Sequence, residues 1–261
     1  MTRARIEATR SSELPNSRLV LQFVYGYNGK DATSQNLFYN AAGQVVYFVA
    51  GVGVVYTRRS GQAGSPAVEA GGGHCQHFFL GHTDDVKALA ICEAEVDVGG
   101  KKYPPRTIVA TAQVSSHDEG PYICVWDSRV GSQQGETQLA RLDFRKEDRG
   151  FSALGFSPDG VFLTAVATDN AHTVYVYDWR RGRMVSSGRG QVGDPPQVYG
   201  VEWNPHAGRH PSVPHAFLTF GKKNIKMWGR EALPAGGGGP WAPRQLSTGR
   251  LDMQNVHSAA W

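Results

Sequence analysis

The chain has 261 residues, of which 40% are hydrophobic and 19% are charged. Its 27 lysines and arginines exceed its 23 aspartates and glutamates, giving a formal charge of +4. This mild excess allows an acidic protein partner and does not require nucleic acid. The three cysteines are odd in number, widely spaced and without a Cys-x-x-Cys motif, which argues against a disulfide framework or a zinc ribbon. No apolar run approaches the roughly 20 residues of a membrane span. We therefore expect a soluble intracellular protein without a cofactor, a membrane contact or a nucleic-acid partner.

The N-terminal part begins with a polar segment, residues 1–13, which we expect to be disordered. Short β-branched and aromatic runs follow at residues 19–25, 45–49 and 54–56, separated by Asn-Gly and Gly turns. We interpret their aromatic residues as buried strand faces, since strand periodicity usually reports burial. These residues are Phe23, Tyr25, Tyr47, Phe48 and Tyr56.

Two segments rich in glycine interrupt the strand pattern. Residues 58–80 are predicted to form a Gly-rich loop that ends in a closing strand, and residues 233–255 are predicted to form a Gly/Pro-rich loop. No segment has a sustained helical period, so we expect no long helix or coiled coil.

Internal repeats are the strongest signal in the chain. Three classes of apolar segment, five or six residues long, recur in a fixed order, and the third class ends on Trp126, Tyr177 and Trp228, at intervals of 51 residues. Such an order, repeated every 40–50 residues, is typical of β-propeller blades, each of which buries its faces against its neighbours. We expect repeats at residues 81–130, 144–188 and 196–232, and the first strand of a further blade at residues 256–261.

The first repeat opens with Gly81-His82 and closes with Trp126-Asp127, the Gly-His and Trp-Asp signature of WD repeats. Upstream, residues 14–57 resemble the hydrophobic HELP motif of the echinoderm microtubule-associated protein-like family, and the resemblance continues to Trp261. It is carried by Leu14-Pro15-Asn16-Ser17-Arg18, by Gly81-His82-Thr83-Asp84-Asp85, by Val125-Trp126-Asp127-Ser128 and by Thr219-Phe220-Gly221-Lys222.

The resemblance implies that the HELP motif is built into an all-β WD-repeat propeller. Longer members of the family carry an N-terminal trimerising coiled coil and two complete propellers. In this sequence we count one blade in the motif region, three later blades and one orphan strand. We therefore expect an incomplete propeller of about four blades that forms part of a tandem pair, because an open ring leaves exposed strand edges.

The signature residues are expected to hold blades together rather than to react. His82, Thr111 and Trp126 are predicted to form a buried hydrogen-bonded chain, because a buried indole N–H and imidazole need partners. Asp118 or Asp169 is expected to supply a turn carboxylate, and Asp169 is better placed because it directly follows a strand. The full set of blade-signature residues is Gly81, His82, Thr111, Trp126, Asp127, Asp169, Tyr177, Asp178 and Trp228.

An enzyme is the less favoured alternative. His82 has no nucleophile in its motif, and a hydrolase in the central channel would need convergent acid, base or metal groups that the motifs do not contain. The cluster His74, Cys75, His77 and His82 does not have the spacing of ordinary zinc ligands. We expect no catalytic residue and no metal site.

Four basic clusters are candidates for partner binding, although charge runs more often mark solvated faces. The resemblance implies binding to tubulin or microtubules, organisation of the microtubule cytoskeleton and a location in the cytoplasm or on the cytoskeleton, with the cilium as a further location. The alternative is a general protein-interaction scaffold without direct tubulin binding, with the cilium as one location. The candidate residues are Arg58, Arg59, Lys101, Lys102, Arg180, Arg181, Arg183, Lys222, Lys223 and Lys226.

Overall fold

The computed structural model describes residues 20–29, 35–58, 74–129, 137–193, 197–207, 215–232, 238–247, 249 and 252–261. In this part of the chain, strands dominate, and the only helices are the single 3-10 turns η1 (Lys146–Asp148) and η2 (Trp179–Arg181). No helix among these residues has the length and apolarity needed to cross a bilayer.

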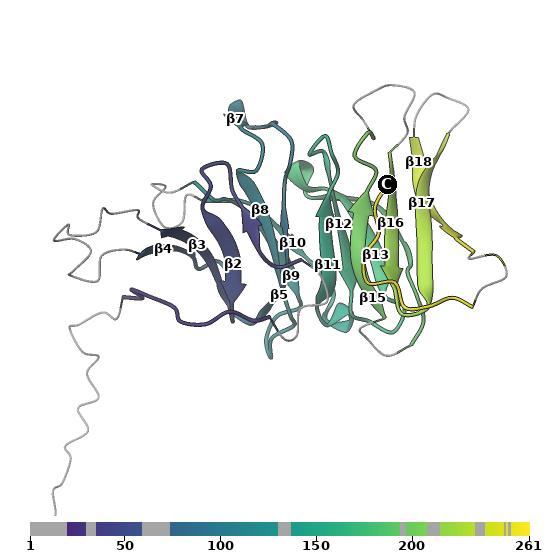
Figure 1. Ribbon diagram of the computed structural model, residues 1–261, viewed down its shortest axis with the longest axis horizontal. Helices are drawn as coiled ribbons and strands as arrows, with labels where there is room; N and C mark the ends of the chain where they lie inside the picture. Colours follow the sequence, from purple (N-terminus) through teal and green to yellow (C-terminus); the bar gives the residue numbers. More distant parts are fainter. Residues whose placement is uncertain are drawn as a thin grey trace, which may run out of the picture.

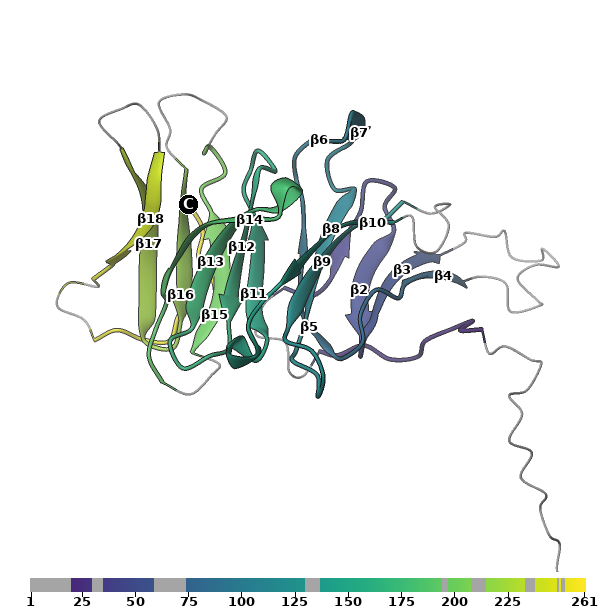
Figure 2. The same ribbon diagram turned by 180° about the vertical axis from the view of Figure 1, so that it is seen from behind.

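Four antiparallel four-stranded sheets follow one another along the chain and lie side by side in space (Figures 1 and 2). We call them blades 1 to 4. Their strands are, for blade 1, β1 (Phe38–Tyr39), β2 (Val45–Val49), β3 (Val52–Arg58) and β4 (His74–Phe79); for blade 2, β5 (Val86–Ile91), β8 (Ile108–Gln113), β9 (Tyr122–Asp127) and β10 (Gln138–Asp143); for blade 3, β11 (Phe151–Phe156), β12 (Phe162–Ala167), β13 (Thr173–Asp178) and β14 (Arg183–Arg189); and for blade 4, β15 (Val198–Trp203), β16 (Ala216–Gly221), β17 (Asn224–Ala232) and β18 (Gly238–Gln245).

The core is divided between the blades rather than gathered at one centre. One apolar cluster joins blades 1 and 2 around Phe79 and Trp126, a second joins blades 2 and 3, and a third joins blades 3 and 4 around Trp228. The first strands of neighbouring blades pack together, as β5 does with β11 and β11 with β15. Each sheet therefore buries its faces against the next, and the prediction of an all-β WD-repeat propeller with about four blades is confirmed.

Two blades extend beyond the predicted repeat boundaries. The second blade ends with β10, past residue 130, and the segment 233–255 that was predicted to be a Gly/Pro-rich loop contains β18. The ladder to β17 and the buried side chain of Trp241 stabilise β18. Its prolines are tolerated because β18 is the last strand of its sheet, where a missing N–H leaves no ladder partner unsatisfied.

Residues 256–261, which the sequence predicts as the first strand of a further blade, are not paired into a sheet. The structure assigns no strand to residues 252–261, which run as extended chain beside blade 4. Val256 donates one backbone hydrogen bond to Gly221, and the Trp261 indole donates another to the Glu202 carbonyl. Two isolated bonds do not make a ladder.

The first run of the motif region also differs from its prediction. Residues 20–29 form no strand, and Phe23 and Tyr25 lie on the surface, with Tyr25 85% exposed. The backbone of Val24 is held by a side chain instead of a strand, since Gln76 accepts from its N–H at 2.7 Å and donates to its C=O at 2.9 Å. Tyr47 and Phe48 in β2 are buried, as predicted.

Candidate functional site

The blade 2 signature residues form a continuous chain of hydrogen bonds. The Trp126 indole N–H donates to the Thr111 hydroxyl at 3.0 Å, and this hydroxyl lies 2.7 Å from His82 Nε2. His82 Nδ1 lies 3.1 Å from Gln113 Oε1, which also accepts from the Thr83 amide at 3.0 Å. Since Gln113 Oε1 can only accept, His82 carries its proton on Nδ1 and Thr111 donates to Nε2.

His82 is therefore a neutral structural histidine in this geometry. Burial lowers its pKa to about 4, and the hydrogen bond to Gln113 offsets only part of that effect. Tyr122 stacks on its ring at 5.4 Å and donates to the carbonyl of Gly81 at 3.0 Å. Both ring nitrogens are engaged within the blade, which leaves neither in position for acid–base chemistry.

The metal hypothesis for the histidine and cysteine cluster gains no support. Among the described residues, no three His, Cys, Asp or Glu side chains lie close enough to hold an ion. Cys75 Sγ lies 3.4 Å from His77 Nε2 at the surface of β4, whereas His82 points into blade 2.

Blade 4 repeats half of the blade 2 chain, and blade 3 does not. Trp228 donates to the Thr219 hydroxyl at 2.9 Å. In blade 3 the register position of that threonine is held by Ala165, and Tyr177 stands where the tryptophans stand. The equal sequence intervals thus mark equivalent positions without equivalent contacts.

The remaining signature carboxylates fix turns. Asp169 accepts from the Thr173 amide and hydroxyl, both at 2.7 Å, in the turn between β12 and β13. Asp127 is 3% exposed and pairs with Arg129 at 2.6 Å, and Asp178 pairs with Arg181 at 2.9 Å. Asp118 lies instead beside His117, exposed.

The basic clusters fall on two opposite rims of the blades. Because strands alternate in direction, the β5–β8 and β13–β14 connections share one rim. The β5–β8 connection contains a short hairpin of β6 (Val96–Val98) and β7 (Lys101–Tyr103), and we call this rim the hairpin rim. The β16–β17 turn with Lys222 and Lys223 lies at the other, which we call the turn rim (Figures 1 and 2). Lys226 lies near the turn rim and donates to the Arg189 carbonyl at 3.2 Å. Arg58 ends β3, and Arg59 lies outside the described residues.

The hairpin rim brings two predicted clusters together. Arg180 of η2 reaches the Asp97 carbonyl in the β6–β7 hairpin at 3.5 Å, which joins blades 2 and 3. Arg129 lies over the Tyr103 ring at 4.8 Å, and Lys101 lies over the same ring at 5.2 Å. Sequence reasoning missed Arg129, although it lies two residues after the Trp-Asp signature. The side chains gathered on this rim are Lys101, Lys102, Arg129, Arg180, Arg181 and Arg183.

Some of these charges are compensated and others are not. Lys102 pairs with Glu95, Arg129 with Asp127, and Arg181 with Asp178. Lys101, Arg180 and Arg183 take part in none of the ion pairs found among the described residues. The rim therefore presents cations that an acidic partner surface can approach.

Four stacked sheets with a Gly-His and Trp-Asp hydrogen-bonded chain define a WD-repeat propeller protein. A HELP motif matches residues 14–54. Over 227 residues the chain is 33% identical to echinoderm microtubule-associated protein-like 2 of Rattus norvegicus. The aligned region covers 84% of this chain and 29% of the relative. It is 33% identical over 219 residues to the 77 kDa echinoderm microtubule-associated protein of Strongylocentrotus purpuratus. This alignment covers 82% of this chain and 26% of the relative.

Echinoderm microtubule-associated protein-like 4 of Homo sapiens matches at 30% identity over 227 residues, covering 83% of this chain and 19% of the relative. The chain belongs to the echinoderm microtubule-associated protein-like family. It spans less than a third of the length of these curated relatives.

Proposed function

We propose that this chain associates with microtubules through the hairpin rim and contributes to the organisation of the microtubule cytoskeleton. The observation that carries the proposal is the meeting of the β6–β7 hairpin and η2, which gathers basic side chains from two blades on one rim. The names of the relatives supply the partner, since each is described as microtubule-associated or similar to such a protein. The site acts by binding and has no part that we assign to catalysis.

Charge attraction of this kind affects the association rate and the salt dependence most strongly. The binding of tubulin is therefore expected to weaken as ionic strength rises. Loops on a rigid sheet scaffold suit such a role, because the sheets hold side chains from different blades in a fixed arrangement.

The test is microtubule co-sedimentation of the 261-residue chain at two salt concentrations. The variant Lys101→Glu/Arg180→Glu reverses two charges on the hairpin rim, and Lys222→Glu/Lys223→Glu makes the same charge change on the turn rim. We expect the first to weaken binding at least about tenfold, which corresponds to about 1.4 kcal/mol, and the second to have a smaller effect. Equal loss in both variants would contradict the assignment to the hairpin rim, and no pelleting of a folded wild-type chain would contradict direct binding.

The alternative is a protein-interaction scaffold without direct tubulin binding, with the cilium as one location. It is favoured by the apolar and aromatic side chains displayed along residues 20–29, where Val20 is 74% and Tyr25 85% exposed. Exposed apolar clusters of this kind mark protein contacts more often than solvated surface. A folded chain that fails to pellet with microtubules at either salt concentration would support this alternative.

A further inference from the structure

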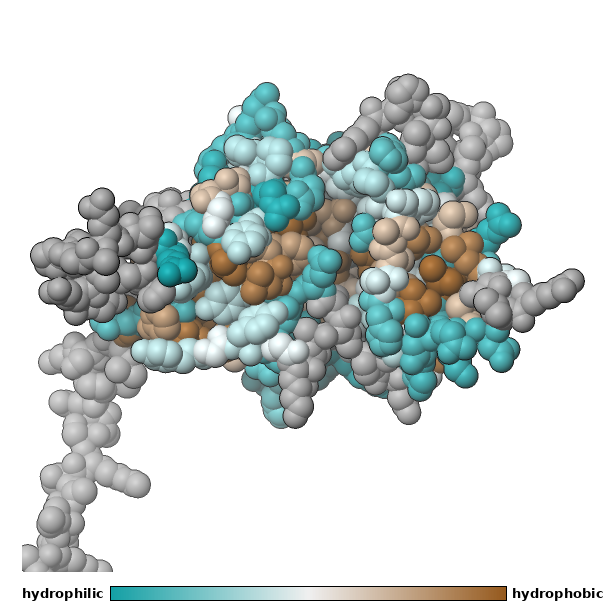
Figure 3. Space-filling model, in the orientation of Figure 1, coloured by the Kyte–Doolittle hydropathy of each residue, from teal (hydrophilic) through white to brown (hydrophobic). Residues whose placement is uncertain are grey.

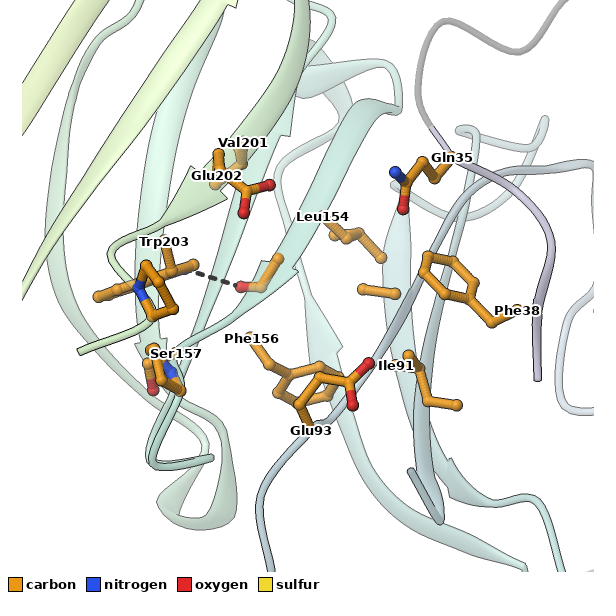
Figure 4. Close-up of a pocket in the computed structure, with 14 residues that line it drawn as sticks. Gln35, Phe38, Ile91, Glu93, Leu154, Phe156, Ser157, Val201, Glu202 and Trp203 are labelled. Carbon is orange, nitrogen blue, oxygen red and sulfur yellow. Dashed lines mark hydrogen bonds between the residues drawn. The ribbon is translucent and has the colours of Figure 1, made fainter. Parts of the chain in front are cut away.

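A hollow lies where the inner strands of blades 2, 3 and 4 face the first strand of blade 1. Its first cavity has a volume of about 290 Å³ and runs between Gln35 and Phe38 on one side and Leu154 and Glu202 on the other (Figure 4). An adjoining cavity of about 370 Å³ shares these four residues. Glu202 therefore stands on a wall common to both cavities. No motif in the sequence pointed to it.

Among the described residues that line the hollow, the charged side chains are acidic. Glu93 and Glu202 line the first cavity, no described lysine or arginine lines either one, and Figure 4 shows both carboxylates at the pocket. Glu93 is already paired with Arg106 at 2.6 Å. The Glu202 carboxylate has no hydrogen bond or ion pair among the contacts that the structure describes, and its partial burial raises its pKa. Glu202 is an exposed residue and thus offers an uncompensated carboxylate at the wall of the cavity.

Aromatic side chains line the same cavity. Phe38, Phe156 and Trp203 line the first cavity (Figure 4). The Trp203 indole N–H is already donated to the Gly155 carbonyl at 3.2 Å, so this tryptophan offers the cavity apolar surface rather than a donor. A planar, weakly hydrated cation that forms a bidentate bond to a carboxylate and stacks on aromatic rings suits such a lining, and the guanidinium group has these properties.

The walls also accommodate extended polypeptide. Residues 257–259 line the second cavity, and they belong to the extended segment 252–261. His257 stacks on Tyr199 at 5.4 Å, and the Trp261 indole donates to the Glu202 carbonyl at 3.2 Å. The surface beside β15 therefore already holds a strand-like segment without a full ladder. The first cavity continues along the same surface.

We propose that the first cavity binds an arginine side chain presented by an extended peptide, with Glu202 as the counter-ion and the Phe38 ring as a stacking surface. This site is separate from the basic side chains of the hairpin rim and selects partners of the opposite charge. It does not rest on the proposed microtubule association.

The test is isothermal titration calorimetry of the 261-residue chain with an acetylated and amidated pentapeptide, Ala-Ala-Arg-Ala-Ala. Peptides with lysine or citrulline at the central position serve as probes of charge and shape. We expect the arginine peptide to bind, the lysine peptide to bind several-fold more weakly and the neutral citrulline peptide to show no measurable binding. Tubulin is absent, so failure here is distinguishable from failure of the proposed function.

Two variants and one control separate the site from general electrostatics. Glu202→Gln should weaken binding of the arginine peptide at least tenfold, and Phe38→Leu should weaken it several-fold while keeping an apolar side chain. Glu147→Gln makes the same charge change at η1, at an exposed residue that lines neither cavity, and should leave binding unchanged. Circular dichroism checks that each variant is folded. The proposal is overturned if the arginine peptide does not bind, if it binds Glu202→Gln as tightly as wild type, or if citrulline or lysine replaces arginine without loss.

Discussion

The indole N–H of Trp228 donates to the Thr219 hydroxyl at 2.9 Å, and this bond in blade 4 repeats the bond that Trp126 makes to Thr111 in blade 2. Both tryptophans and both threonines are buried. The two sites differ in one respect, because only the Thr111 hydroxyl also bonds to a histidine. The pair of sites therefore provides an internal comparison of one hydrogen bond against a longer chain.

We expect Thr219→Val to lower the free energy of unfolding by about 1–3 kcal/mol, the typical cost of leaving one buried donor unsatisfied. Thr111→Val should cost more, since it strands both the Trp126 indole N–H and His82 Nε2. Urea unfolding followed by tryptophan fluorescence measures both losses. Thr111→Ser keeps the hydroxyl and serves as the control; a loss in Thr111→Ser as large as in Thr111→Val would show that the methyl group matters and the hydrogen bonds do not.

The stability of the protein should fall as the pH drops from 6.5 to 4. The pKa of His82 is lowered to about 4 in the folded chain by burial, whereas an unfolded histidine titrates near 6.5. Between these values the unfolded state binds the additional proton, so the free energy of unfolding rises with pH in this window. The full effect corresponds to about 3 kcal/mol.

Thermal unfolding of the wild type and of His82→Gln, measured between pH 4 and pH 8, tests this expectation. His82→Gln removes the titrating group, so the difference in melting temperature between the two proteins should shrink toward low pH. A difference that stays constant across the range would rule out His82 as a source of acid sensitivity.

Trp126 and Trp228 each pack against a glycine of the preceding blade, and the contact at Trp228 leaves no room for a methyl group. A Cβ at Gly188 of β14 would lie 2.8 Å from Cζ3 of Trp228, whereas a Cβ at Gly229 of β17 would meet nothing within 4 Å. We expect Gly188→Ala to destabilise the chain by about 1–3 kcal/mol through overpacking. Gly229→Ala, the matched control, should leave the unfolding midpoint nearly unchanged. Equal unfolding midpoints for the two variants would contradict this expectation, because they would show that blades 3 and 4 can move apart to accommodate a methyl group at Gly188.

The repeat pattern predicted most of the architecture because it records which residues face a neighbouring blade. Trp126 and Trp228 recur at the same place in the third strand, and both are buried. Trp126 stacks on Phe79 of blade 1 at 4.8 Å, and Trp228 faces Gly188 of blade 3 while stacking on Phe217 of its own blade at 5.6 Å. The pattern could not predict β18, since Gly238 and Pro240 indicate a loop in isolation. Only the pairing with β17 and the pocket for Trp241 make a strand there.

The candidate sites were less accessible to sequence reasoning. The hairpin rim depends on a contact between Arg180 and Asp97 that links distant parts of the chain, and no spacing encodes it. The position of Glu202 at the cavity could not be predicted either. In the sequence it is one polar residue of a strand, and only the packing of the inner strands creates the cavity that it lines. Phe23 and Tyr25 show the converse, because their alternating pattern indicates burial in a sheet that the structure does not extend to them.

The motif region thus contains a buried part and an exposed part, and their side chains should respond differently to truncation. Phe48 in β2 is 3% exposed and packs in the cluster between blades 1 and 2, whereas Tyr25 is 85% exposed. We expect Phe48→Ala to cost about 3–5 kcal/mol in the free energy of unfolding, the range for removing a buried aromatic ring. Tyr25→Ser should change it by less than about 0.5 kcal/mol, as surface substitutions do.

Urea unfolding monitored by circular dichroism gives both values. Tyr56→Ser, at a half-buried position in β3, should fall between them. If Tyr25→Ser proved as destabilising as Phe48→Ala, the aromatic residues at 20–29 would belong to the core, and the exposed apolar surface that favours the scaffold alternative would not exist. A small effect at Tyr25 instead frees that side chain for substitution in pelleting experiments, since any loss of binding could then be assigned to the surface rather than to unfolding.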